Sequence, residues 1–209
     1  MNTRSIVLIL SVLLPSAGMV GAGLGTNVTS PFKILTRADW NAKPPVGDMK
    51  THKPTHITIH HTATPQKPER SLADKVKALQ EFSQKPGKLG SGKNKPAWPD
   101  VPYHFYIDCN GGIAEGRDVL FVGDTNTEYD PSGHLLIVLE GNFEDTQPTP
   151  SQMKSLRQLA GWAMDRWMIP ASHIAGHKDF ATTACPGKHM QDLLPTLRKV
   201  VLESENRNF

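Results

Sequence analysis

Residues 134–140 read HLLIVLE, a run of five apolar residues between a histidine and a glutamate. A short apolar run of this kind predicts a strand that is covered on both faces, as in the centre of a mixed sheet. Residues 56–60 (HITIH) alternate in character and predict a second strand. Residues 103–108 and 113–115 flank the turn sequence Asn110-Gly111-Gly112, which predicts a hairpin.

Three helices are predicted between and after these strands. The first covers 72–83, with Ser71 as its N-cap and apolar residues at helical spacing. The second starts at 149 and ends near 168, ahead of Pro170, and the third covers about 190–202. Interleaved strands and helices predict a single α/β domain, with a mixed central sheet flanked by about three helices.

The composition is that of an ordinary globular domain. The chain has 209 residues, enough for one domain with short tails, and its hydrophobic content of 38% excludes a disordered or fibrous protein. The net charge of +3 is too small for a nucleic-acid-binding surface. Residues 36–45 (TRADWNAKPP) are expected to pack as an arm against the domain. Residues 85–99 contain four lysines and predict a long, mobile basic loop.

The N-terminus has the pattern of a signal peptide. Arg4 precedes the apolar run 5–15 (SIVLILSVLLP), and small residues follow, so that cleavage after Ala17 or Ala22 is expected. An uncleaved anchor is the alternative, but a membrane span needs about 20 apolar residues. The expected divisions are a signal peptide (1–22), a linker (23–35), the main domain (36–203) and a tail (204–209). We therefore expect an exported monomer, periplasmic or extracellular, without a stable membrane anchor.

Three residues have the chemistry of a zinc site. His60 ends a predicted strand, and His177 and Cys185 lie in the segment GHKDFATTACPG. Imidazole and thiolate are preferred zinc ligands, and three protein ligands leave the fourth position of a tetrahedral site open for water. This is the pattern of a catalytic zinc site, because a structural site has four protein ligands.

Spacing alone leaves other interpretations open. His61, His104 and His189 compete for the ligand positions, and a disulfide between Cys109 and Cys185 would remove the thiolate. A third alternative is a cysteine nucleophile, with Cys185 activated by His177 or His60.

The motifs taken together resemble a known family, the type 2 N-acetylmuramoyl-L-alanine amidases. This superfamily includes bacteriophage amidase-lysozymes and animal peptidoglycan recognition proteins. The resemblance extends from about residue 36 to 198. It is carried by HITIHHTA (56–63), WPDVPYHFYIDCNGGIAEGRD (98–118), LEGNFED (139–145) and IAGHKDFATTACPG (174–187).

The resemblance implies a mixed sheet with one zinc ion per chain in a surface groove. It places the zinc ligands on His60, His177 and Cys185, and the catalytic tyrosine on Tyr103. Thr183, two residues before the cysteine ligand, becomes a second catalytic candidate. Non-catalytic receptors of the family typically lose the cysteine, so its presence implies an enzyme and makes a disulfide to Cys109 improbable.

Further candidates depend on the same motifs. Asp179 is expected either to orient a zinc-bound imidazole or to cap its loop. Arg117 is expected either to bind a stem-peptide carboxylate or to form a structural ion pair. The next residues, Asp118-Val119, match neither pair that sets stem-peptide preference in the recognition proteins. Glu115 is a weak candidate for a general base. Strand alternation places Tyr103 and Phe105 on one face.

The expected activity is therefore zinc-dependent hydrolysis of the amide bond that joins the lactyl group of N-acetylmuramic acid to L-alanine. The expected partners are peptidoglycan or muropeptides, with no nucleic acid. Two rival functions are a peptidoglycan receptor without turnover and a cysteine peptidase acting on the wall peptide.

Overall fold

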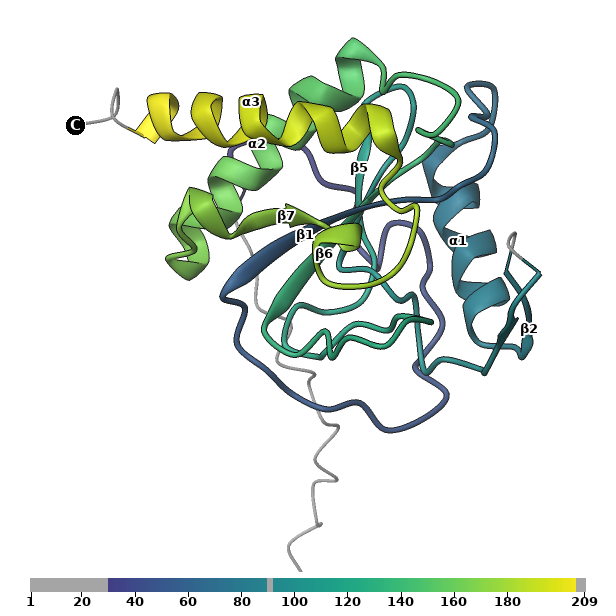
Figure 1. Ribbon diagram of the computed structural model, residues 1–209. Helices are drawn as coiled ribbons and strands as arrows, with labels where there is room; N and C mark the ends of the chain where they lie inside the picture. Colours follow the sequence, from purple (N-terminus) through teal and green to yellow (C-terminus); the bar gives the residue numbers. More distant parts are fainter. Residues whose placement is uncertain (1–29, 90–91, 206–209) are drawn as a thin grey trace, which may run out of the picture.

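The computed structural model describes residues 30–89 and 92–205 (Figure 1). The expected signal peptide, 1–22, lies outside the described residues, as do 23–29 of the expected linker and 206–209 of the tail. Among the helices of the described ranges, none has both the length and the apolar character that crossing a membrane requires.

A five-stranded mixed sheet forms the centre of the domain, in the order β5-β4-β6-β1-β7. The apolar run of the sequence forms β6, which pairs in parallel with β1 on one side and β4 on the other. β7 pairs in parallel with β1, and β5 is antiparallel to β4, which confirms the hairpin. The strands are β1 (His56–His61), β4 (Phe105–Ile107), β5 (Ile113–Glu115), β6 (His134–Leu139) and β7 (Ile174–Gly176).

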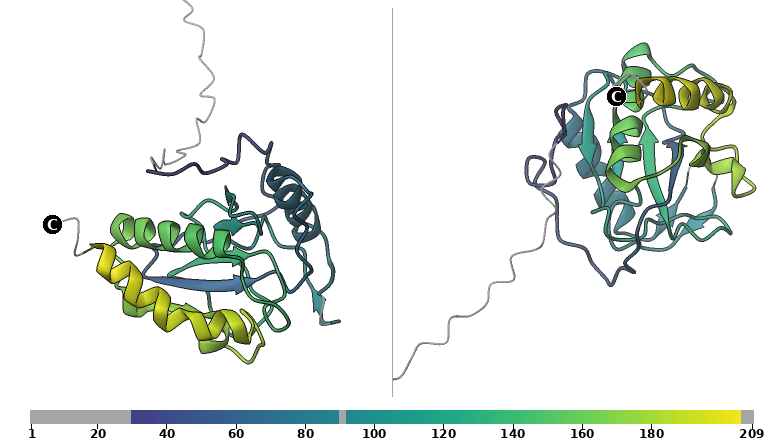
Figure 2. Two further views of the ribbon diagram at one scale, coloured as in Figure 1. Left: turned by 90° about the horizontal axis from the view of Figure 1, so that it is seen from above. Right: turned by 90° about the vertical axis from the view of Figure 1, so that its left-hand side faces the viewer.

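The three helices agree with the sequence pattern and lie on both faces of the sheet. They are α1 (Leu72–Ser83), α2 (Pro150–Trp167) and α3 (Lys188–Glu205). Ser71 caps α1 by accepting from the Asp74 amide, and Thr149 forms a capping box with Gln152 at the start of α2. Helices α2 and α3 run next to each other over one face, whereas α1 lies apart from them on the other (Figures 1 and 2).

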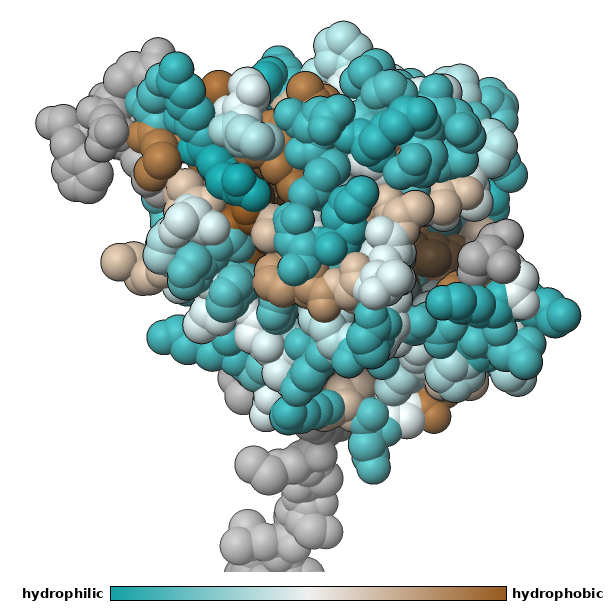
Figure 3. Space-filling view, in the orientation of Figure 1, coloured by the Kyte–Doolittle hydropathy of each residue, from teal (hydrophilic) through white to brown (hydrophobic). Residues whose placement is uncertain are grey.

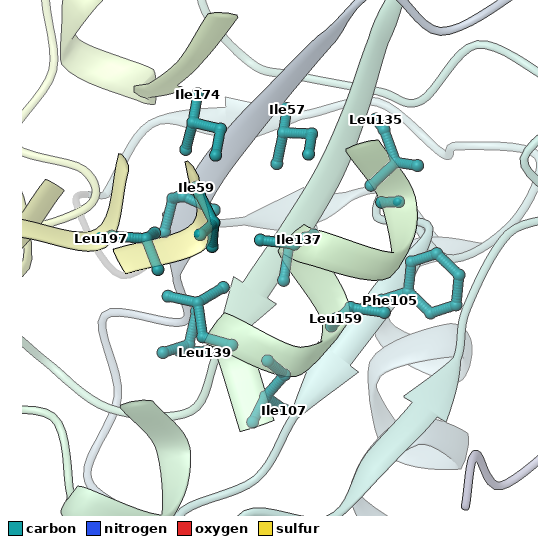
Figure 4. Close-up of a cluster of buried hydrophobic side chains, with 14 of the residues drawn as sticks. Ile57, Ile59, Phe105, Ile107, Leu135, Ile137, Leu139, Leu159, Ile174 and Leu197 are labelled. Carbon is teal, nitrogen blue, oxygen red and sulfur yellow. The ribbon is translucent and has the colours of Figure 1, made fainter. Parts of the chain in front are cut away.

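Strand alternation divides the sheet residues between two clusters. Ile57 and Ile59 of β1 join Leu135, Ile137 and Leu139 of β6 in the main core, against α2 and α3 (Figure 4). Val138 faces the other way and joins the α1 cluster. Because residues two apart share a face, Thr58 and His60 also point away from α2 and α3. The candidate ligand His60 therefore lies on the less densely covered side of the sheet.

The segment before β1 packs against the domain. Trp40 is fully buried and its Nε1 donates a 2.8 Å hydrogen bond to the Glu115 carbonyl, as the expected arm requires. Phe32 and Ile34 pack against the main core, and Leu35 forms a β-bridge with Ala114. Residues 30–35 are therefore not a free linker, because their apolar side chains find partners on the folded domain.

The described parts of the lysine-rich segment, 85–89 and 92–99, are more ordered than predicted. It contains a short hairpin of β2 (Gly87–Lys88) and β3 (Asn94–Lys95). Lys95 is buried, donates to the carbonyls of Ser83 and Pro96 at 3.0 Å each, and lies over the Phe82 and Trp98 rings. The prediction of a mobile loop was wrong for this residue, because its ammonium joins the hairpin to the end of α1.

Candidate metal centre and groove

Two parallel strands and one loop bring the three candidate ligands together. β1 and β7 are adjacent, so His60 near the end of β1 and His177 directly after β7 lie at the same edge of the sheet. Cys185 approaches from the loop ahead of α3. One potential ligand atom from each residue lies within 4.8 Å of the other two. The His60 Nδ1 to Cys185 Sγ distance is 3.6 Å, and the two imidazole centroids are 4.6 Å apart.

Burial sets the protonation of these residues. Desolvation lowers the pKa of His60 well below its usual value, and that of His177 to about 4, so both imidazoles are neutral and keep a lone pair. Burial raises the pKa of the Cys185 thiol to about 12, opposed by the His61 amide, which donates to Sγ at 3.4 Å. Two neutral imidazoles supply no charge that stabilises a thiolate, whereas a divalent cation does.

The donor set fits a zinc ion. His60 Nε2 is buried and, within the described residues, has no hydrogen-bond partner, so the protein contacts leave this imidazole free to act as a ligand. Two nitrogens and one sulfur are borderline-soft donors of the kind that zinc prefers. With three protein ligands, one tetrahedral position is left for water or substrate.

Tyr103 lies beside this centre. Its ring centroid is 5.1 Å from that of His60, and burial raises the pKa of its hydroxyl, which therefore stays protonated as a donor. The expectation that Tyr103 and Phe105 share a face was wrong. Tyr103 precedes β4, outside the alternating strand, and packs in the α1 cluster, whereas Phe105 packs in the main core. Both ring nitrogens of His104 are hydrogen-bonded to the backbone. Nε2 contacts the Phe121 carbonyl and Nδ1 accepts from the Leu136 amide, so neither is available as a metal ligand.

The loop residues near the ligands make mainly local contacts. Thr183 Oγ1 accepts a 3.2 Å hydrogen bond from the Cys185 amide, so it shapes the loop that presents the thiol. The Asp179 carboxylate accepts from the Gly176 amide and the Gln191 side chain, both at 2.8 Å. These contacts correspond to the loop-capping alternative for Asp179, because the carboxylate is occupied by donors other than an imidazole.

The partner of His177 is a residue that sequence analysis missed. Its Nε2 lies 2.8 Å from Thr127 Oγ1 and 3.3 Å from Thr125 Oγ1. Both threonines belong to a polar loop after β5 that carries none of the quoted motifs. Nothing in the sequence pattern indicates that this loop reaches the edge of the sheet at β7.

The contacts of Arg117 favour the structural ion pair over the alternative of substrate binding. The guanidinium is 2% exposed and donates to the carbonyls of Val101, Val122 and Asp100 while pairing with Asp124. All its nitrogens are engaged, so none is free for a stem-peptide carboxylate. Glu115 is also occupied, because its carboxylate accepts from the Arg37 amide.

Arg117→Ala is expected to destabilise the fold by about 3 kcal/mol, because several buried acceptors and the Asp124 carboxylate lose their donor. Urea unfolding of the purified variant measures this loss. Lys67→Ala, which removes a cation from the groove wall, is the control and should leave the unfolding midpoint nearly unchanged. Wild-type stability of the Arg117 variant combined with a raised KM would restore the substrate-binding interpretation.

A groove of about 600 Å³ opens beside Tyr103, between the end of β1, helix α1 and the β2–β3 hairpin. Figure 3 shows a recessed apolar area next to α1. Cationic side chains line the groove together with one carboxylate, Glu140, which is paired with the buried Lys75 at 2.9 Å. The other lining residues include Lys67, Arg70, Lys88, Phe82, Trp98, Tyr103 and Tyr106.

Both cysteines are free, which excludes the disulfide alternative in this structure. Cys109 is buried, and its sulfur is 3.8 Å from Lys75 Nζ, in the polar cluster below the groove. The thiol of Cys185 is therefore available to the metal centre.

Comparisons with known proteins agree with this architecture. The profile of the family described as N-acetylmuramoyl-L-alanine amidase matches residues 50–188. Peptidoglycan-recognition protein SD of Drosophila melanogaster is 28% identical over 175 residues, covering 80% of this chain and 87% of the relative. Its crystal structure superposes with a TM-score of 0.66 at 27% identity, over 78% of this chain and 92% of that chain. N-acetylmuramoyl-L-alanine amidase LysC from Clostridium intestinale URNW superposes with a TM-score of 0.59 at 26% identity. The superposition covers 74% of this chain and 93% of that chain.

Proposed function

Because the chain belongs to the N-acetylmuramoyl-L-alanine amidase family, we propose that it is a zinc-dependent amidase. The bond cleaved is the amide between the lactyl group of N-acetylmuramic acid and the L-alanine of the stem peptide. The observation that carries this proposal is the convergence of His60, His177 and Cys185, with ligand atoms within 4.8 Å of one another. A receptor that only recognises peptidoglycan has no need of a complete ligand set with one open position.

His60, His177 and Cys185 would hold the zinc ion. When bound, zinc supplies a Lewis acid that polarises a carbonyl oxygen and lowers the pKa of water toward neutrality. The neutral imidazoles would each offer a lone pair to the ion, and the His61 amide, which donates to the Cys185 sulfur, would support a negative charge there. A thiolate donates more charge to the metal than an imidazole does, so protein donors must contribute to stabilising the oxyanion.

Tyr103 is the candidate for that donor. Because burial keeps its hydroxyl protonated, Tyr103 donates a hydrogen bond to the oxygen that becomes negative when the amide carbonyl turns tetrahedral. Thr183 shapes the loop of Cys185, and its hydroxyl is a second candidate contact to water or to the oxyanion. Both residues act at the transition state, so their loss lowers kcat more than it raises KM.

The groove suits a muropeptide substrate. Tyr103 lines the groove and its ring lies 5.1 Å from that of His60, so a chain bound along the groove would reach the metal centre at this tyrosine. Lys67, Arg70 and Lys88 provide positive charge for the carboxylates of a stem peptide, and the aromatic side chains provide contact area for sugar or peptide. The signal-peptide pattern at the N-terminus supports export to the compartment that contains peptidoglycan.

The cysteine peptidase alternative is less well supported. A cysteine nucleophile needs a lowered thiol pKa and an imidazolium partner. In this structure burial raises the Cys185 pKa to about 12, and the neighbouring imidazoles are held neutral.

The test combines metal analysis with product analysis. Purified protein is expected to contain one zinc per chain, and digestion of peptidoglycan should release intact stem peptides with a free L-alanine amino group, detected by mass spectrometry. Dialysis against a chelator should abolish release, and added zinc should restore it. A metal-loaded protein that binds peptidoglycan but releases no peptide would make the chain a receptor. Activity that survives chelation and is lost on alkylation would make it a cysteine peptidase.

A further inference from the structure

We propose that Thr127 is a positioning residue that fixes the tautomer and orientation of His177, so that Nδ1 of this imidazole binds the metal. This inference rests on the proposed metal centre and extends it to the loop 124–128. The observation behind it is the 2.8 Å contact between Thr127 Oγ1 and His177 Nε2, which occupies one of the two ring nitrogens.

The chemistry of the imidazole gives this contact a direction. A neutral imidazole that offers a lone pair from one nitrogen carries its proton on the other. With Nδ1 at the metal, Nε2–H donates to Thr127 Oγ1. The Thr127 hydroxyl can in turn donate a hydrogen bond to Thr125 Oγ1, which is 2.7 Å away. The three groups then form a directional chain, in which each hydroxyl accepts one hydrogen bond.

The loop that carries Thr127 is fixed on both sides. Asp124 pairs with the buried Arg117, and the Asn126 side chain donates to the Asn94 carbonyl of the hairpin at 3.0 Å. Glu128 accepts from the Thr182 amide, at 2.8 Å, in the loop that leads to Cys185. Thr127 thus contacts the candidate ligand His177, and the next residue, Glu128, binds the loop that carries Cys185. This arrangement predefines the imidazole position before any metal binds.

Loss of the Thr127 hydroxyl is expected to weaken zinc binding, so the test measures zinc affinity in addition to turnover. Thr127→Val keeps the shape of the side chain but removes the hydroxyl, and should weaken zinc binding by about 10–100-fold in competition with a chromophoric chelator. Thr127→Ser restores the hydroxyl and should bind zinc nearly as tightly as wild type. Thr146→Val is the matched control, since it makes the same change at an exposed site where, among the described residues, the hydroxyl donates to the Asn142 carbonyl alone.

The outcomes separate this inference from the proposed function. If the wild-type chain binds no zinc, or if Cys185→Ser binds it equally tightly, both are overturned. If those conditions hold and Thr127→Val keeps wild-type affinity, only the inference falls. Nitrogen NMR of zinc-loaded wild-type protein gives a second reading that needs no variant. A proton on His177 Nε2 supports the inference, and a proton on Nδ1 overturns it.

Discussion

Cys185→Ser is expected to lower amidase turnover by more than about 10³-fold, because catalysis loses the several kcal/mol that a correctly held metal supplies. A serine hydroxyl is not deprotonated near neutral pH and is a poor zinc ligand, so the site keeps two neutral imidazoles alone. Zinc content after gel filtration should fall together with activity. The measurements are metal analysis and the rate of stem-peptide release from peptidoglycan.

Cys109→Ser is the matched control for this experiment. Both cysteines are free, but Cys109 lies next to Lys75 and Glu140 in the cluster below the groove. Its replacement should leave zinc content unchanged. If Cys185→Ser retained one zinc per chain and wild-type activity after chelation and reloading, the sulfur would not be a ligand and the zinc site would need a different third residue.

Most of the sheet and the three helices could be predicted from the sequence, because their local patterns are clear. The apolar run of β6, the alternation in β1 and the Ser71 cap of α1 each act over a few residues, and each appears in the structure. β7 was missed because three residues, Ile174–Gly176, are too short to show a period. Its place next to β1 is fixed by tertiary pairing, and it is this pairing that brings His177 to His60.

The surroundings of the site depend on tertiary contacts that no local pattern encodes. Arginine is usually exposed, so the sequence allowed a substrate-binding Arg117, whereas folding buries it among backbone carbonyls. The partner of His177 comes from Thr127, 50 positions away in the chain, with no motif around it. The family resemblance indicated three ligand types, and the structure brings the three residues within 4.8 Å of one another. The residues that contact those ligands, such as Thr127, could be identified only from the three-dimensional structure.

The second large effect concerns Tyr103, which we expect to act through its hydroxyl and not through its packing. Tyr103→Phe keeps the ring in the α1 cluster and against His60. Removing one oxyanion donor typically costs about 10²–10³ in kcat. The variant should therefore fold normally, contain one zinc, bind muropeptide with a nearly unchanged KM and lose most of its turnover.

Tyr106→Phe gives the comparison that separates chemistry from packing. Tyr106 is a buried tyrosine of the same cluster and lines the same groove, yet its described contacts include none of the three ligand residues. Losing its hydroxyl should change kcat far less than the same loss at Tyr103. If Tyr103→Phe turned over at the wild-type rate, oxyanion stabilisation would have to come from elsewhere, and the hydroxyl of Thr183 on the Cys185 loop would be the next candidate. Equal losses in both tyrosine variants would instead mean that the groove needs hydroxyls for substrate binding, which would appear in KM. A large loss in kcat confined to Tyr103 is the pattern that a donor to the transition state must give, because only such a donor gains strength as the carbonyl oxygen becomes negative.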